Sequence, residues 1–221
     1  MRKALSPGVR IGFVVAALAL FVAALLLASA IPPVEGLGDK VRLPMFHGGS
    51  TWVNMAAFTL MGLFALAYLL FSREDLYRWA AGFRIVAAPL WVVNSILGVI
   101  AAASTWDFSG SASTPLTVIR DDPRLMAQFQ IVILLIAVIA IDAMFDSRRL
   151  RALMDVLFTI AMWWLLAGIF LDPRARALHP DSPVLNSASD IQIPFFGIVG
   201  CLFLAACSVA WLWRDHLLRN E

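Results

Sequence analysis

Long uncharged stretches alternate with short polar segments along the whole chain, and this alternation predicts the fold. Each apolar stretch is long enough to cross the hydrocarbon core of a membrane as a helix, which takes roughly 20 residues. The approximate bounds of the stretches are 11–31, 48–71, 77–103, 124–145, 152–171 and 191–213. The pattern therefore predicts an all-α integral membrane protein with six transmembrane helices, organised as a single transmembrane domain over residues 1–221.

Composition agrees with a membrane protein and excludes several other classes. Hydrophobic residues make up 61% of the chain and charged residues only 14%, whereas a soluble domain is nearer half apolar and a quarter charged. The lipid bilayer is thus the expected surroundings, and no soluble domain of any size fits between the spans. The net charge of +2 is too small to indicate nucleic-acid binding.

The distribution of positive charge predicts the orientation. Lys and Arg number ten in the amino-terminal segment, the 72–78 and 146–151 turns and the carboxyl-terminal tail, against six in the other loops. By the positive-inside rule both termini are expected in the cytoplasm, and the expected location is the cell inner (plasma) membrane. The first stretch is long for a cleaved signal peptide, which favours a retained helix, but Leu27–Ala30 offers a loose cleavage site and leaves cleavage open.

A histidine at the expected start of the second span is the first residue suited to carry chemistry. His47 lies between Phe46 and Trp52 on the expected non-cytoplasmic side, and the two glycines that follow it allow a tight turn or a close approach. An imidazole at the lip of a bilayer can ligate a metal or a haem iron. A water-facing histidine in a loop explains the same position.

A second histidine, His179, falls in another loop on the same expected side. Two such histidines can hold the iron of a planar ligand from both axial positions, with aromatic rings over its faces and arginines paired to its propionates. An ordinary interfacial tryptophan belt is the alternative, and zinc is disfavoured because these loops lack cysteine. The aromatic candidates are Trp52, Trp106, Trp163 and Trp164, and the cationic candidates are Arg42, Arg124, Arg174 and Arg176.

A second group of polar residues falls inside the spans. Arg84, Asp142 and Asp155 are expected about two turns from the cytoplasmic edge, where charges usually pair or extend toward the interface. A structural charge pair between Arg84 and one of the aspartates is the favoured interpretation. The alternative is a functional one, a path for protons. Three amides, Asn94, Gln128 and Gln130, either bond between helices or line a polar pocket below the outer loops.

Short motifs over most of the chain resemble one family. Gly38–Trp52, with Phe46-His47, resembles the start of the second helix of the haem-handling membrane proteins of cytochrome c maturation (the CcmC and CcsA type). Asp122-Pro123-Arg124-Leu125 resembles the end of that family's tryptophan-rich haem-binding loop. Trp163-Trp164 and His179–Pro183 resemble the segment with the family's second outer histidine.

The resemblance implies a function. A haem b would be held at the outer membrane face and presented to an acceptor in cytochrome c biogenesis, with a haem chaperone and an ABC transporter of the maturation system as possible partners. His47 and His179 would be the axial ligands, and the chain would supply binding and orientation rather than side-chain catalysis. The further contacts implied are Trp52, Trp106, Asp122, Arg124, Trp163 and Trp164.

One departure from the family supports a rival interpretation. The family's loop has several tryptophans directly before its aspartate, where this chain has residues 117–121, Thr-Val-Ile-Arg-Asp. The rival is a structural or assembly subunit of a larger membrane complex, which keeps the scaffold without binding haem.

Overall fold

The computed structural model describes residues 4–105, 114, 116–117, 120, 122–171, 184 and 187–220. In this part of the chain six helices are long and apolar enough to cross a membrane. The chain is therefore an all-α, six-helix membrane protein, which confirms the fold predicted from the hydrophobic pattern. The helices are α1 (Pro7–Ser29), α2 (Arg42–Phe71), α3 (Glu74–Thr105), α5 (Pro123–Met144), α6 (Arg148–Leu171) and α8 (Ser189–Arg219), and a short 3-10 helix, η1 (Asp39–Val41), precedes α2.

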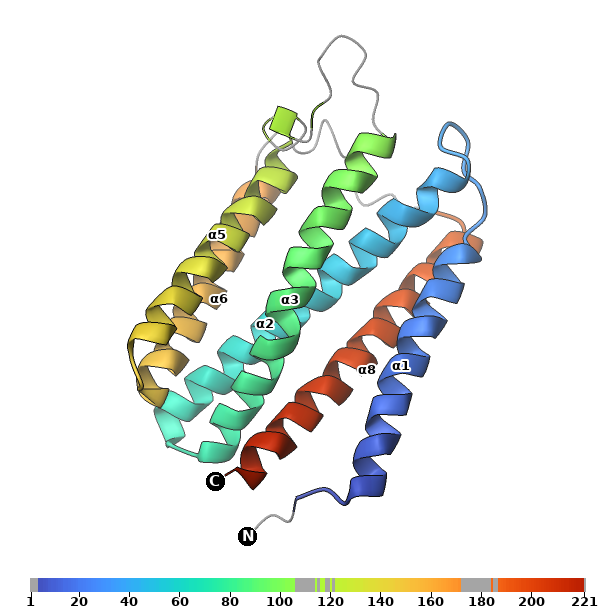
Figure 1. Cartoon of the computed structure of the whole chain (residues 1–221). Helices are drawn as coiled ribbons and strands as arrows, with labels where there is room; N and C mark the ends of the chain where they lie inside the picture. The colour runs from blue at the N-terminus through green and yellow to red at the C-terminus, as the bar shows by residue number, and fades with distance from the viewer. Residues whose placement is uncertain are drawn as a thin grey trace.

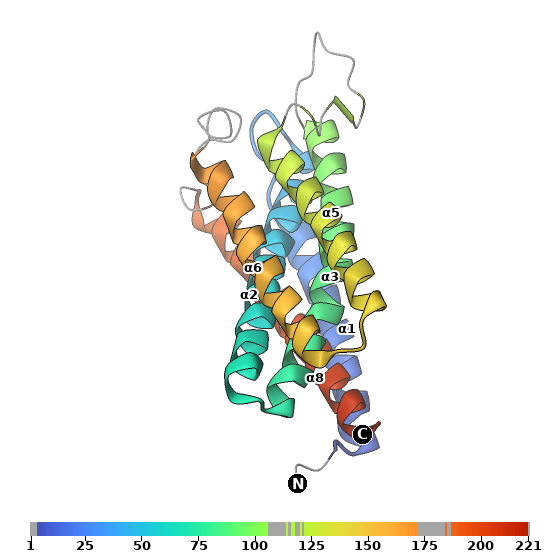
Figure 2. The same ribbon diagram turned by 90° about the vertical axis from the view of Figure 1, so that its left-hand side faces the viewer.

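The long helices run alternately up and down, and both termini lie at one end, called here the lower end (Figure 1). The upper end carries the first turns of α2, α5 and α8 and the last turns of α1, α3 and α6. The α2–α3 pair forms the centre of the bundle. Helices α1 and α8 pack together on one side of this pair, and α5 and α6 pack together on the other (Figures 1 and 2).

Local sequence explains where some of the helices begin and end. At the start of α5, the Asp122 carboxylate accepts hydrogen bonds from the backbone N–H groups of Arg124 and Leu125, and Pro123 occupies the first turn, where its missing N–H costs nothing. At the end of α2, Ser72 adopts a left-handed conformation with a φ of 53°, and its N–H bonds back to the Tyr68 carbonyl. This conformation ends the helix and starts the short turn into α3.

Helix α2 begins at Arg42 rather than near Gly48, which corrects the position expected for His47. The histidine lies in the second turn of the helix and not in the preceding loop. Of the two roles expected for the glycines after it, a tight turn or a close approach, the structure shows the close approach. A Cβ at Gly49 would lie 3.1 Å from the Ile198 side chain, and one at Gly48 would lie 3.6 Å from Phe195, so their small size lets α2 approach α8.

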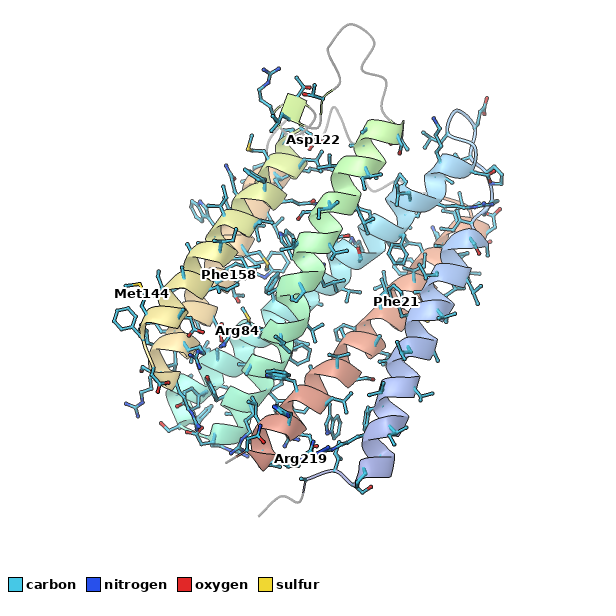
Figure 3. All side chains as sticks on the ribbon, in the orientation of Figure 1. Phe21, Arg84, Asp122, Met144, Phe158 and Arg219 are labelled. Atoms are coloured by element: carbon cyan, nitrogen blue, oxygen red, sulfur yellow. The ribbon has the colours of Figure 1, made fainter. Side chains whose placement is uncertain are left out.

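An apolar core fills the middle of the bundle between α2, α3, α5 and α6. The Phe58 ring lies 4.8 Å from Phe158 and 5.9 Å from Trp91, measured between ring centroids, and all three side chains are buried. Figure 3 shows Phe158 at mid-height, above Arg84 and well below Asp122. This core separates two groups of polar residues, one toward each end.

Candidate functional site

Neutral polar side chains from three helices meet in the upper half of the bundle. We call this group the upper polar cluster, and it is almost completely buried apart from its half-buried histidine and threonine. Its hydrogen bonds link α2 to α3 and reach toward α5. The members are His47, Ser50, Thr51 and Asn54 on α2, Asn94 on α3, and Gln128 on α5.

The hydrogen bonds of His47 determine which ring nitrogen carries the proton. Its Nδ1 lies 3.1 Å from the Asn94 main-chain oxygen and 3.1 Å from Asn94 Oδ1. Both oxygens can only accept, so Nδ1 is the protonated nitrogen and donates to them. In the neutral ring the lone pair is therefore on Nε2, which lies 3.5 Å from the amide nitrogen of Gln128.

Asn94 is the centre of the cluster. Its Nδ2 donates to Thr51 Oγ1 at 2.7 Å, and its Oδ1 can also accept from the Ser50 hydroxyl. The Thr51 hydroxyl donates in turn to the main-chain oxygen of His47 at 2.9 Å. Both the nitrogen and the oxygen of the Asn94 amide thus bond to the turn of α2 that carries the histidine.

Gly98, one turn above Asn94 on α3, provides the space for the imidazole. A Cβ on Gly98 would lie 2.7 Å from Cε1 and 3.1 Å from Nε2 of His47, and 3.1 Å from Gln128 Oε1. Real Cβ atoms do not approach other atoms as closely as 2.7 Å. The ring therefore lies directly against the backbone of α3, in a position that a larger residue would block.

Three buried polar atoms of the cluster have no hydrogen-bond partner among the described residues. They are Oε1 of Gln128 and both amide atoms of Asn54, a side chain that is 0% exposed. Leaving a buried polar group unpaired costs about 1–3 kcal/mol. The described part of the cluster therefore has hydrogen-bonding atoms that the protein around them does not use, and one of them belongs to Gln128, the neighbour of His47.

Three of the four tryptophans predicted near the histidine lie elsewhere. Trp52 packs edge-on against Phe195 of α8, with ring centroids 5.9 Å apart, whereas His47 faces α3 and α5. Trp163 donates from Nε1 to Thr59 Oγ1 at 3.0 Å, three turns further down α2 than the histidine. Trp164 is 80% exposed on the outer surface of α6. These three rings do not gather around His47.

The other predicted contacts are divided between the upper end and the undescribed residues. Asp122 is buried at the head of α5 (Figure 3), and Arg124 follows it, half-buried. Arg42 donates to the main-chain oxygen of Ile31 at 3.1 Å and pairs with Asp39 at 3.0 Å. The remaining candidates lie outside the described residues, namely Trp106, Arg174, Arg176 and His179.

The hydrogen-bond pattern of His47 is one that a metal-binding histidine can have. An Nδ1–H bonded to a carbonyl and a lone pair on Nε2 is the arrangement in which proteins hold metal-binding histidines. The other described histidine, His216, belongs to the last turn of α8 at the lower end. Within the described ranges there is no group of three or more His, Cys, Asp or Glu side chains that could hold a bare metal ion.

Charged side chains gather in the lower half of the bundle. We call the group of Arg84, Asp155, Asp142, Arg151 and Tyr77 the lower ionic cluster. Arg84 of α3 donates from Nε to Asp155 Oδ1 of α6 at 2.8 Å, with a second contact through its Nη2. Asp142 pairs instead with Arg151, which also donates to the Tyr77 hydroxyl at 3.0 Å.

Sequence reasoning missed several residues that the structure brings into these groups. The hydroxyls of Ser50 and Thr51 follow His47 by three and four residues, a spacing that places them one turn away on the helix, and this signal was available once His47 was assigned to a helix. Arg151 was read as part of a basic turn, although a cation following an intramembrane aspartate across a tight turn is a candidate partner. Gly98 gave no signal before its neighbours were known.

Comparisons with known proteins add no assignment. No protein-family model matches the chain, and no characterised protein matches it in a comparison of sequences.

Proposed function

We propose that this chain is a haem-handling membrane protein of cytochrome c biogenesis, which holds haem b at the non-cytoplasmic face of the inner membrane and presents it to an acceptor. The observation that supports the proposal is the state of His47. It is fixed near one end of the bundle with its proton on Nδ1 and its lone pair on Nε2.

In this proposal His47 supplies one axial ligand and His179 the other. Asp122 and Arg124 lie at the same end of the bundle as His47, and the buried Asp122 caps α5 there. We assign Arg124 to a haem propionate, because a guanidinium pairs well with a carboxylate. The residues linking α3 to α5 and α6 to α8, which include Trp106 and His179, join helices whose described ends lie at this same end.

Bound haem would supply a redox-active iron and a large apolar plane. The chain's own residues would bind and orient it, and apart from axial ligation no side chain would take part in a chemical step. An exposed apolar surface on the outer helices keeps the protein in lipid, so that haem is delivered from the membrane to a partner. A haem chaperone and an ABC transporter of the maturation system are the partners proposed, on the strength of the resemblance alone.

A scaffold or assembly subunit without haem is the second candidate function. The position of three tryptophans favours it. Trp52 packs against α8, Trp163 bonds to the middle of α2, and Trp164 is exposed on the outer surface, so none of the three rings lies over His47. In that case the upper polar cluster would only hold α2, α3 and α5 together.

The two candidates are separated by the haem content of the purified protein. We expect the wild type, supplied with haem, to show a Soret absorption band close to one haem per chain, and His47→Ala to lose most of it. His216→Ala is the matched control, because His216 is an exposed histidine at the lower end. It should keep the full band. A wild type that takes up no haem, or a His47→Ala variant with undiminished haem, would support the scaffold.

A further inference from the structure

Two residues one turn apart on α3 face His47, and neither was expected to have a role together with it. Asn94 contacts the Nδ1 side of the ring, and Gly98 lies against its Cε1 and Nε2 atoms. Residues four apart share one face of a helix, so Asn94 offers hydrogen-bond acceptors and Gly98 leaves room for the same imidazole. We propose that Asn94 and Gly98 are the positioning residues of His47, which select its tautomer and aim Nε2 toward α5.

Asn94 selects the tautomer through two acceptors. The main-chain and side-chain oxygens of this residue are both 3.1 Å from Nδ1. A ring protonated only on Nε2 would place its Nδ1 lone pair against both oxygens. The Asn94 side chain is itself fixed, because its Nδ2 donates to Thr51 on the neighbouring helix. The side-chain oxygen therefore cannot turn away from the ring without breaking that bond.

Gly98 determines where the ring lies. With any side chain at this position the first carbon would overlap Cε1, at 2.7 Å. The imidazole would then have to rotate away from α3 and lose its contacts with Asn94. Gln128 Oε1 would lie 3.1 Å from the same Cβ, and Gln128 Nε2 lies 3.5 Å from His47 Nε2, so Gly98 keeps room for both side chains.

This inference deepens the proposed function and rests on it for its purpose, which is to orient His47 as an axial ligand of the haem iron. Partners that orient a metal-binding histidine raise the basicity of the ligand, and their loss typically lowers metal affinity about 10- to 100-fold. The tautomer of His47, however, is a property of the haem-free protein. It can be measured whether or not haem binds.

The test is nitrogen NMR of the histidine rings in haem-free protein, with His216→Ala to simplify the assignment. In the His216→Ala protein, we expect His47 to have a protonated Nδ1 and an unprotonated Nε2. Gly98→Ala and Asn94→Leu should each convert this to a mixture of tautomers. Asn94→Asp keeps the acceptor oxygens and should restore the Nδ1–H form.

Matched glycine controls separate positioning from general helix effects. A Cβ at Gly168 or Gly200 meets no atom within 4 Å, so Gly168→Ala and Gly200→Ala should leave the His47 signals unchanged. Should Gly98→Ala fail to fold, Asn94→Leu carries the test alone. A protonated Nε2 in the wild type, or one unchanged tautomer in both α3 variants, overturns the inference. Absence of haem from a wild type with the expected tautomer overturns the proposed function only.

Discussion

In the lower ionic cluster, charges meet partners of opposite sign, whereas in the upper polar cluster some buried neutral groups have no partner among the described residues. Arg84 and Asp155 contact each other through two nitrogens and two oxygens. In the upper polar cluster, Asn54 is equally well buried, but neither of its amide atoms has a partner in the described part of the chain. Both regions bury polar groups inside an apolar helical bundle, and they differ in how completely those groups are satisfied.

The difference follows from the cost of each kind of burial. An uncompensated charge in a membrane interior is expensive enough that charges there pair with one another or face water. An unpaired neutral amide costs only about 1–3 kcal/mol, which a bundle of this size can tolerate. A region that must bind something can therefore be built from neutral amides, hydroxyls and one imidazole, with unused hydrogen-bonding atoms, at a modest loss of stability.

The apolar core between the two clusters bears on the idea of a proton path. Along α3, Trp91 lies between Arg84 and Asn94, and along α2, Phe58 separates Asn54 from the lower half. Both rings are buried and in contact with each other. Among the described residues the two clusters are therefore separate polar groups, and the arrangement favours a static charge pair at the lower end over proton transfer.

The largest effect is expected when the buried ion pair is broken. Arg84→Met leaves the Asp155 carboxylate, whose side chain is only 2% exposed, without its cation. We expect a loss of about 3–5 kcal/mol in the free energy of unfolding, measured by denaturant titration in detergent micelles. The double variant Arg84→Met/Asp155→Leu should recover most of this loss. A single variant as stable as the wild type would mean that the pair does not hold α3 to α6.

Most of the fold could be predicted from the sequence, because each span carries its own signal. Uninterrupted apolar stretches identified all six helices, although α2 begins at Arg42 rather than near 48 and α8 continues to Arg219, past the expected 213. The last turns of α8 are charged, and they stay helical because Arg214 pairs with Asp75 and Asp215 pairs with Arg10. Hydropathy cannot register such contacts between distant segments.

The candidate site was less predictable, because its geometry depends on how neighbouring helices are rotated. The glycines after His47 allowed either a turn or a close approach, and only the position of α8 shows that they are packing residues. Asp142 and Asp155 were equivalent partners for Arg84 in the sequence, but α6 presents Asp155 to it, while Asp142 meets Arg151. Asn94 was noted as a polar residue within a span, but no sequence pattern indicated that it would bond to His47.

An intermediate effect, of opposite sign, is expected in the upper polar cluster. Asn54→Leu replaces an unpaired amide with an apolar side chain of similar size, and we expect it to raise the free energy of unfolding by about 1 kcal/mol. The same assay as for Arg84→Met applies. Asn94→Leu is the matched control, and should lower stability, because its amide bonds to Thr51 and His47.

A loss of stability in Asn54→Leu would change the comparison. It would mean that Asn54 is satisfied by an internal water or ligand, and that the upper cluster is as fully paired as the lower one. Haem content measured on the same variant would then show whether the occupant matters for binding.

The smallest effect is expected for an ion pair at the surface of the lower end. Glu74 and Arg148 lie 2.7 Å apart, but their side chains are 44% and 47% exposed, so water competes for both. Glu74→Gln should change the free energy of unfolding by less than about 1 kcal/mol, and added salt should reduce even this, since exposed pairs are screened. Asp155→Asn, the same chemical change in the buried pair, should cost several times more. Suppose that Glu74→Gln and Asp155→Asn lower the free energy of unfolding equally. Charge, and not burial, would then make the lower end stable, and the contrast between the two ends of the bundle would lose its physical basis.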